Sequence, residues 1–118
     1  MNADQLAEIR PAIHEAIEGA PDTCVTLAVA GANDRWIQVM DHTINAAYPL
    51  AGDPGDIMKT LPVIPGLDLS SWVAETFVTF EFLEPDLTPL AEWIDAYFVT
   101  VLACAPGDYH LDVSSEKL

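Results

Sequence analysis

Three histidines, His14, His42 and His110, are the side chains of this sequence best suited to bind a metal or to transfer protons. His42 and His110, together with carboxylates, could supply the nitrogen and oxygen ligands that zinc accepts, but no spacing in the chain supports such a site. The sequence also lacks the GxSxG, glycine-rich phosphate-loop and HExxH patterns. We therefore expect no metal site and no cofactor, and we expect His14 to lie on the surface.

Carboxylates are so numerous in this chain that some pairs must lie close together by chance. Glu75, Thr79 and Glu81 alternate along one expected strand and would share one of its faces. A catalytic pair of carboxylates requires one raised pKa in an apolar pocket, and a solvated strand face explains these residues equally well. We therefore expect a protein that is not an enzyme and has no catalytic residues.

The net charge indicates a kind of partner. The 118 residues include 19 Asp and Glu but only 4 Lys and Arg, which gives a formal net charge of −15. Direct binding to nucleic acid or to an anionic membrane needs clustered cations, so neither is expected. Electrostatic steering would speed the association of this chain with a basic protein. The expected partner is therefore a protein, and the charge favours a basic one.

The composition also predicts a folded chain in a reducing compartment. Hydrophobic residues make up 51% of the sequence, which is enough for one core. Cys24 and Cys104 are isolated among apolar neighbours, which favours two buried thiols over a disulfide. No leader pattern opens the chain, and no apolar run is long enough to span a bilayer. We expect one domain over residues 1–118 and a cytoplasmic location.

Two long amphipathic helices are predicted. The first ends near Glu18, and Pro11 should kink it or delay its start to about residue 9. Its apolar side chains share one side and its carboxylates the other: Leu6, Ile9, Ile13 and Ile17 lie on the inner side, and Asp4, Glu8, Glu15 and Glu18 on the outer side. The last helix runs from Asp86 or Thr88 to about residue 105 and carries a wide apolar stripe.

Alternation of apolar residues and turn signals place the strands between these helices. Strands are expected at residues 23–30, 36–40 and 44–48, followed by a short helix at 56–61 and a loop at 63–69. Residues 72–83 form one further strand or a hairpin that turns near Ala74 and Glu75, and residues 108–118 form a partly ordered tail. The fold class is α+β: an antiparallel sheet of four to five strands with two long helices packed on one face.

Several residues are candidates for contact with a partner. Tryptophan is enriched where interfaces derive most of their binding energy, and Trp93 lies at the shoulder of the last helix's apolar stripe, although packing in the core would also explain it. Phe77 lies on the outer face of its strand. The complete set is Asp4, Glu8, Glu15, Glu18, Phe77, Glu92, Trp93, Asp95 and Val99.

A combination of segments resembles a known superfamily. These segments are the Trp-Ile-Gln-Val strand at residues 36–39, the Ile-Asn-Ala-Ala-Tyr-Pro strand at 44–49, the Leu-Pro-Val-Ile-Pro-Gly loop at 61–66 and the Leu-Ala-Glu-Trp-Ile-Asp-Ala-Tyr-Phe helix at 90–98. Together with the preceding amphipathic helix and hairpin, they are similar to the type III secretion chaperone-like and YbjN-like superfamily. The resemblance implies a small acidic α+β domain, typically dimeric, that binds protein segments and has no catalytic residues.

These observations favour a chaperone-like protein-binding module that forms a homodimer. The alternative is an immunity-like or antitoxin-like inhibitor of a basic protein, or a nucleic-acid mimic, with the acidic side of the first helix as its contact surface. An enzyme or a small-molecule binder would need a deep pocket with convergent polar groups.

Overall fold

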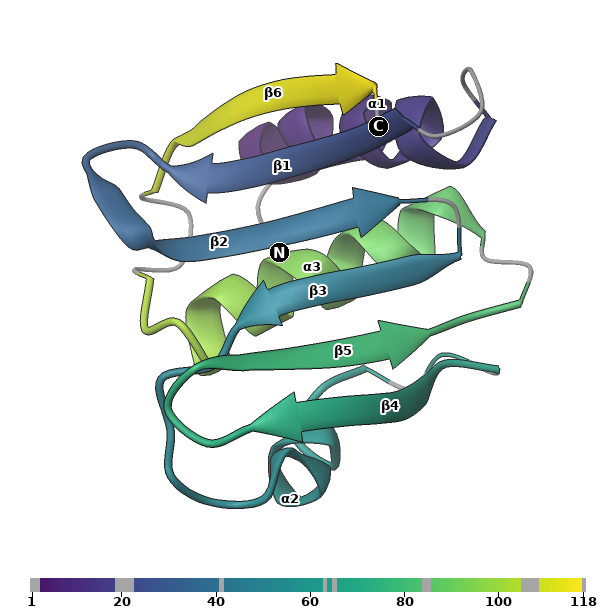
Figure 1. Cartoon of the computed structure of the whole chain (residues 1–118). Helices are drawn as coiled ribbons and strands as arrows, with labels where there is room; N and C mark the ends of the chain where they lie inside the picture. Colours follow the sequence, from purple (N-terminus) through teal and green to yellow (C-terminus); the bar gives the residue numbers. More distant parts are fainter. Residues whose placement is uncertain are drawn as a thin grey trace.

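The computed structural model describes residues 3–18, 23–40, 42–62, 64, 66–83, 86–104 and 109–117. It shows an antiparallel sheet with helices against it (Figure 1). In chain order the elements are α1 (Ala3–Glu18), β1 (Thr23–Val29), β2 (Ala32–Met40), β3 (Thr43–Ala47), α2 (Pro54–Met58), β4 (Asp68–Val73), β5 (Phe77–Glu81), α3 (Leu87–Thr100) and β6 (Leu111–Lys117). The fold therefore belongs to the α+β class that the sequence predicts.

The sheet has six strands in the order β4-β5-β3-β2-β1-β6, so the expected count of four to five strands is too low. The additional strand, β6, lies in the segment expected to be a partly ordered tail. It pairs antiparallel with the whole of β1, from Thr23 opposite Lys117 to Val29 opposite Leu111. Its sequence offers only two apolar residues in alternation, Leu111 and Val113, which is too short a pattern to indicate a strand.

Of the two predictions for residues 72–83, the hairpin is confirmed and the continuous strand is wrong. β4 begins at Asp68, inside the expected loop, and β5 ends at Glu81. The turn between them places Glu75 in the left-handed region, with φ of 59°. Glycine or asparagine usually occupies such a position, and because neither is present here, no clear turn signal is visible in the sequence.

α1 and α3 lie on the same face of the sheet and pack against each other (Figure 1). α1 runs unbroken from Ala3 with the exposed Pro11 inside it, so the expected delayed start is wrong. The core lies between the helices and this face of the sheet, and its fully buried side chains include Ile9, Ile13, Leu27, Ile37, Ile44, Phe80, Ile94 and Phe98. The short α2 is capped at its N-terminus by Asp53, whose carboxylate accepts a hydrogen bond from Gly55 N at 2.7 Å.

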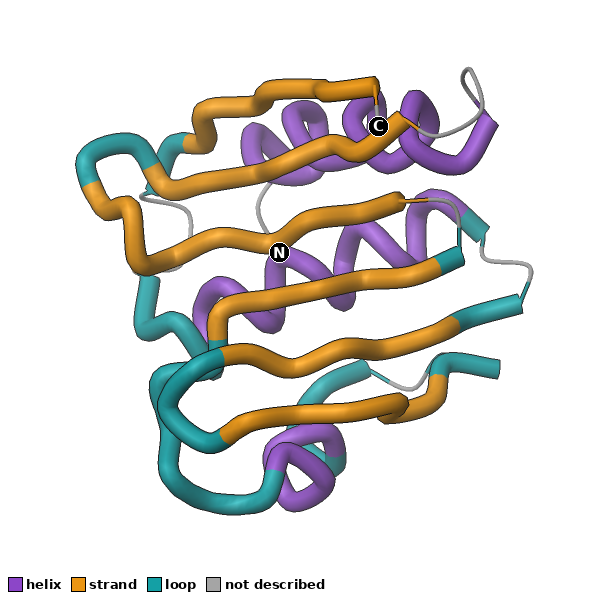
Figure 2. Tube along the Cα trace, in the orientation of Figure 1, coloured by secondary structure: helices purple, strands orange, loops and turns teal. Residues whose placement is uncertain are grey.

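In the part of the chain that the structure describes, the opposite face of the sheet carries no helix. Figure 2 views the molecule from that side and shows the strands in front of α1 and α3. We call this surface the open face. Residues that alternate with the buried positions of each strand point toward it. The described part of the chain leaves the open face uncovered, so its side chains could contact a partner.

Candidate interaction surface

The register of the strands arranges the open face into three rows that cross the sheet. One row, the apolar row, runs from Ala28 through Trp36, Ala47 and Phe77 to Val73. Trp36 and Phe77 are half-buried, and Ala47 between them is only 5% exposed. Two aromatic side chains therefore lie on either side of a small residue, on a sheet face that is otherwise solvated.

The neighbouring row consists of uncharged polar residues. It contains Ser114, Thr26, Gln38, Asn45, Thr79 and Ser71, from β6 across to β4. The Thr79 hydroxyl donates a hydrogen bond to Asn45 Oδ1 at 2.6 Å across β5 and β3. Such residues can form new hydrogen bonds with a docked surface without the cost of desolvating a charge.

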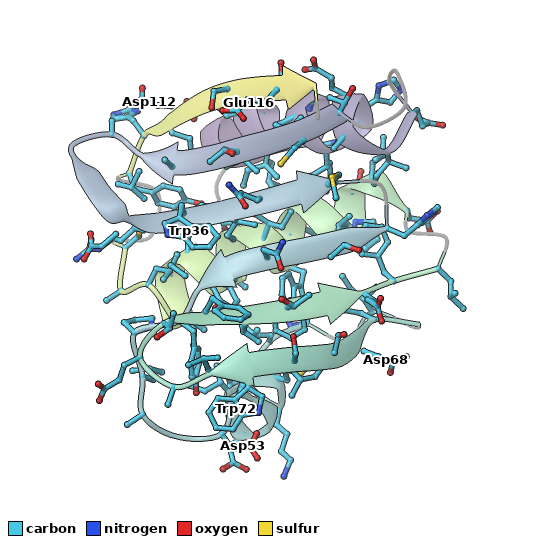
Figure 3. All side chains as sticks on the ribbon, viewed as in Figure 1. Trp36, Asp53, Asp68, Trp72, Asp112 and Glu116 are labelled. Atoms are coloured by element: carbon cyan, nitrogen blue, oxygen red, sulfur yellow. The ribbon has the colours of Figure 1, made fainter. Side chains whose placement is uncertain are left out.

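Carboxylates lie around the rim of the open face. Glu81 and Asp68 belong to the third row, Glu116 lies at its far end on β6, and Asp112 ends the apolar row. All four are exposed, and Figure 3 shows Asp112 and Glu116 at one side of the sheet and Asp68 at the other, with Trp36 between them. Among the side chains that the structure describes, the three rows hold no Lys or Arg, so the potential of this surface is negative.

The carboxylates expected on the outer side of α1 have different surroundings. Glu15 and Glu18 are exposed, and Glu18 lies 2.8 Å from Nε2 of the exposed His14. Glu8 is half-buried, and its Oε2 accepts a hydrogen bond from Leu111 N at 3.2 Å. Asp4 lies within α1, but its side chain is outside the described residues. Glu8 therefore connects α1 to β6, and its contact with a partner stays a prediction.

Trp93 is a core residue and not an exposed anchor. Its side chain is 1% exposed, stacks on Tyr97 with a ring separation of 5.5 Å and meets the edge of Phe80 at 5.0 Å. The shoulder of the α3 stripe is covered because β5 supplies Phe80 from below. Trp93 is therefore buried in this structure, in agreement with the alternative of packing in the core, and its contact with a partner stays a prediction.

The other candidate residues on α3 are also buried or half-buried. Asp95 is only 7% exposed and accepts a hydrogen bond from the Tyr109 hydroxyl. Burial and this hydrogen bond raise the pKa of Tyr109 above its ordinary value. Val99 is half-buried and packs against the core, and Glu92 is half-buried. Asp95 is thus a structural acceptor, and α3 has little free apolar surface.

Neither the cysteines nor the histidines form a reactive centre among the described residues. Cys104 is buried, Cys24 is half-buried, and both are free thiols. Burial raises the pKa of both thiols, in Cys104 against the opposing effect of the nearby Arg35 guanidinium, so both favour the unreactive protonated form. His42 follows β2 and His110 precedes β6, at opposite ends of the sheet. No group of three His, Cys, Asp or Glu in the described ranges could hold a metal.

Comparison with known proteins gives no match to a family model, to a curated protein or to a solved structure. The resemblance to the YbjN-like superfamily therefore stays a prediction. Within the residues described, no helix is long and apolar enough to cross a membrane.

The sequence indicated one part of the open face, because it placed Phe77 on an outer strand face, where the structure has it half-buried. It did not indicate that Trp36 lies in the same row or that Asp68, Asp112 and Glu116 lie at the rim. The alternation within each strand was visible in the sequence. The sequence did not show the order of the strands, which decides which residues become neighbours across the sheet.

Proposed function

We propose that this protein is a non-enzymatic binding module for a basic protein and that it contacts this partner with its open face. The observation that carries the proposal is the pattern of this face: an apolar row with two aromatic residues, a polar row beside it, and exposed carboxylates at the rim with no cation among the described side chains. Interfaces combine such a centre with a polar rim.

The two parts of this surface would have different roles. Trp36 and Phe77 provide the rigid aromatic area in which binding energy concentrates. The rim carboxylates lie in solvent, where they change the rate of association more than the affinity. A basic partner would therefore be attracted over a distance by the rim and held by the apolar row.

The same surface chemistry underlies both modes of action expected from the sequence, a chaperone-like module and an inhibitor of a basic protein. The open face spans six strands and is formed by regular rows, which suits the broad surface of a folded partner. We therefore favour the inhibitor-like mode over a chaperone-like one that holds an extended segment.

The expected homodimer is less well supported than binding to a basic partner. Its proposed contact surface on α3 is reduced, because Trp93 is buried and Val99 packs against the core. Contact between two open faces would bring rim carboxylates of like charge together, which opposes association. We therefore propose that the main partner is a different, basic protein.

Affinity capture from an extract of the source cells tests the proposal, using three versions of the immobilised protein. Glu81→Gln/Glu116→Gln changes the open face, and the matched control Glu15→Gln/Glu18→Gln changes the exposed side of α1. Both variants raise the formal net charge of −15 by two, so they separate the position of the charges from their number.

The proposal expects the wild-type chain and the control to retain the same basic protein, and the open-face variant to release it at a lower salt concentration. Equal release from both variants would show that only the total charge matters. If only the Glu15→Gln/Glu18→Gln variant lost the basic protein, the binding site would lie on α1 and not on the open face. Recovery of only acidic or neutral proteins would overturn the proposal.

A further inference from the structure

A hollow of about 370 Å³ lies at one end of the apolar row, where β2, the end of β3 and the turn between β4 and β5 meet. Trp36, Ala47 and Thr76 are among the residues that line it, and the exposed residues Asp34 and Glu75 line it as well. An indole ring and two carboxylates from separate elements therefore surround one small volume.

The carboxylates reach the hollow from two different parts of the chain. Asp34 and Trp36 both belong to β2 and both line the hollow, at a point where the pairing of β2 with β1 is irregular. The turn that carries Glu75 is held against the segment after β3, because Glu75 N donates to Leu50 O at 2.9 Å and Tyr48 N donates to Thr76 O at 3.3 Å. The side of the hollow that carries Glu75 is thus held by backbone hydrogen bonds.

The lining favours a cationic group, and a guanidinium best of all. A cation is attracted to the face of an indole ring, and carboxylates next to it supply charge-assisted hydrogen bonds. A guanidinium is planar, weakly hydrated and stacks on aromatic rings, which an ammonium does less well. No Lys or Arg lines this hollow, so the described side chains do not occupy it with a cation of their own.

A second hollow makes the contrast clear. The space of about 310 Å³ beside α1 is lined by Arg10 and His14, together with Ala7, Pro11 and Leu87. Among the described residues that line it, the charged or titratable ones are basic and none is a carboxylate, so it offers a cation no partner of opposite charge. The preference for a guanidinium is therefore a property of the hollow at Trp36 and not a general result of the acidic composition.

We infer that the hollow at Trp36, Asp34 and Glu75 binds an arginine side chain of the partner. The inference rests on the proposed function, since it names the group by which a basic protein would be anchored on the open face. It adds a specific preference, because arginine would be bound by the indole and both carboxylates together, whereas the rim alone would not distinguish arginine from lysine.

Nuclear magnetic resonance with a small probe tests this site separately from the rest of the open face. The probe is N-acetyl-arginine amide, and its control is the matching citrulline compound, which has nearly the same shape but no charge. The indole signal of Trp36 is assigned by its loss in Trp36→Phe, since the chain has three tryptophans. Ionic strength is held constant throughout the titration.

The inference expects a saturable shift of the Trp36 indole signal with the arginine compound and none with the citrulline compound. Asp34→Asn/Glu75→Gln should weaken binding by about fivefold or more, because two exposed charge pairs are removed. Glu15→Gln/Glu18→Gln should leave binding unchanged. The arginine compound should also bind more tightly than N-acetyl-lysine amide.

Two results would overturn the inference. One is an equal response to the arginine and citrulline compounds, and the other is an unchanged affinity in Asp34→Asn/Glu75→Gln. In either case a basic partner that still depends on Glu81 and Glu116 would leave the proposed function intact. If binding of the basic partner also proved independent of Glu81 and Glu116, both the inference and the proposed function would be wrong.

Discussion

The three tryptophans lie in three different environments, which determine their roles. Trp93 is 1% exposed inside the core, Trp72 on β4 is 37% exposed beside Tyr48, and Trp36 is half-buried on the open face. The stripe of α3 placed Trp93 at the limit of a helix face, where a sequence cannot show whether a strand packs against it. Phe80 of β5 packs there, so Trp93 is held in the core, whereas Trp36 and Trp72 both keep surface that a partner could contact.

Replacement of Trp93 should destabilise the fold far more than replacement of Trp72. Trp93→Ala would remove a stacked ring and leave a cavity, at a cost of about 3–5 kcal/mol in the free energy of unfolding. Trp72→Ala, at an exposed position of the edge strand, should cost clearly less. Urea unfolding measures both, and Trp93→Phe serves if Trp93→Ala does not fold. Equal losses at the two positions would contradict the core assignment.

Tyr97 should make the fold less stable at high pH. Its hydroxyl donates to Ala47 O at 2.8 Å inside the core, and burial, with a smaller effect of Tyr48, raises its pKa. The unfolded chain then loses the Tyr97 proton first, near the ordinary pKa of 10.0. The stabilising contribution of Tyr97 is therefore complete below that pH and is lost as the pH rises above it.

Unfolding free energies measured on both sides of that pH test this effect. Tyr97→Phe should lower stability by about 1 kcal/mol at neutral pH, because Ala47 O loses its donor. Above the ordinary tyrosine pKa the same change should reduce the decline in stability by about 1.4 kcal/mol per pH unit. An unchanged slope in the variant would show that Tyr97 does not titrate differently in the two states.

At the scale of elements, β6 is held in the sheet by contacts that its own sequence does not indicate. It pairs with β1 along its whole length, Leu111 N donates to Glu8 of α1, and the Tyr109 hydroxyl just before it donates to Asp95 of α3. β1 and Glu8 lie far away in the sequence, and Asp95 lies 14 residues from Tyr109. Long-range pairing of this kind overrides weak local propensity, which is why residues 108–118 gave no strand signal.

Removal of the Glu8 carboxylate should loosen β6 selectively. Glu8→Ala leaves the half-buried Leu111 N without this acceptor, at a cost of about 1 kcal/mol for a partly buried hydrogen bond. Hydrogen exchange should become faster at the amides of β6 while those of β2 and β3 keep their protection. The control Glu15→Ala, on the exposed side of the same helix, should have no such effect. Uniform acceleration in all strands would contradict a local role for Glu8.

The elements with strong local patterns were predictable, and those that depend on distant residues were not. Alternation and periodicity located α1, the first three strands and α3, because each buries one face regardless of its neighbours. The hairpin of β4 and β5 remained an alternative, since Glu75 occupies a turn position that usually requires glycine. The open face was largely hidden from the sequence, because its rows join residues from six strands in non-sequential order.

At the scale of the whole molecule, negative charge is spread around a fold with few cations to balance it. Arg10, Arg35, Lys59 and Lys117 are the only cationic side chains in the sequence apart from the histidines. One ion pair, Lys59 Nζ to Asp56 Oδ1 at 3.8 Å, is largely solvated on both sides and adds little stability. The folded state therefore contains a net repulsion that the unfolded chain reduces by expanding.

Salt should stabilise this protein. An increase from about 10 mM to about 150 mM ionic strength shortens the Debye length from about 30 Å to about 8 Å, which screens the repulsion between the carboxylates. The midpoint of thermal unfolding should rise over this range. Glu15→Gln/Glu18→Gln, which removes two charges without touching the core, should reduce the dependence on salt. A midpoint that is independent of ionic strength would contradict this account.

The central claim is that a basic partner binds the open face and not the acidic side of α1. A titration of the isotope-labelled protein with an octa-arginine peptide, followed residue by residue with nuclear magnetic resonance, tests this claim most directly. The account predicts saturable shifts that concentrate around Trp36, Phe77, Glu81 and Glu116. Shifts that concentrate around Glu15 and Glu18, or that spread evenly over every exposed carboxylate, would contradict it.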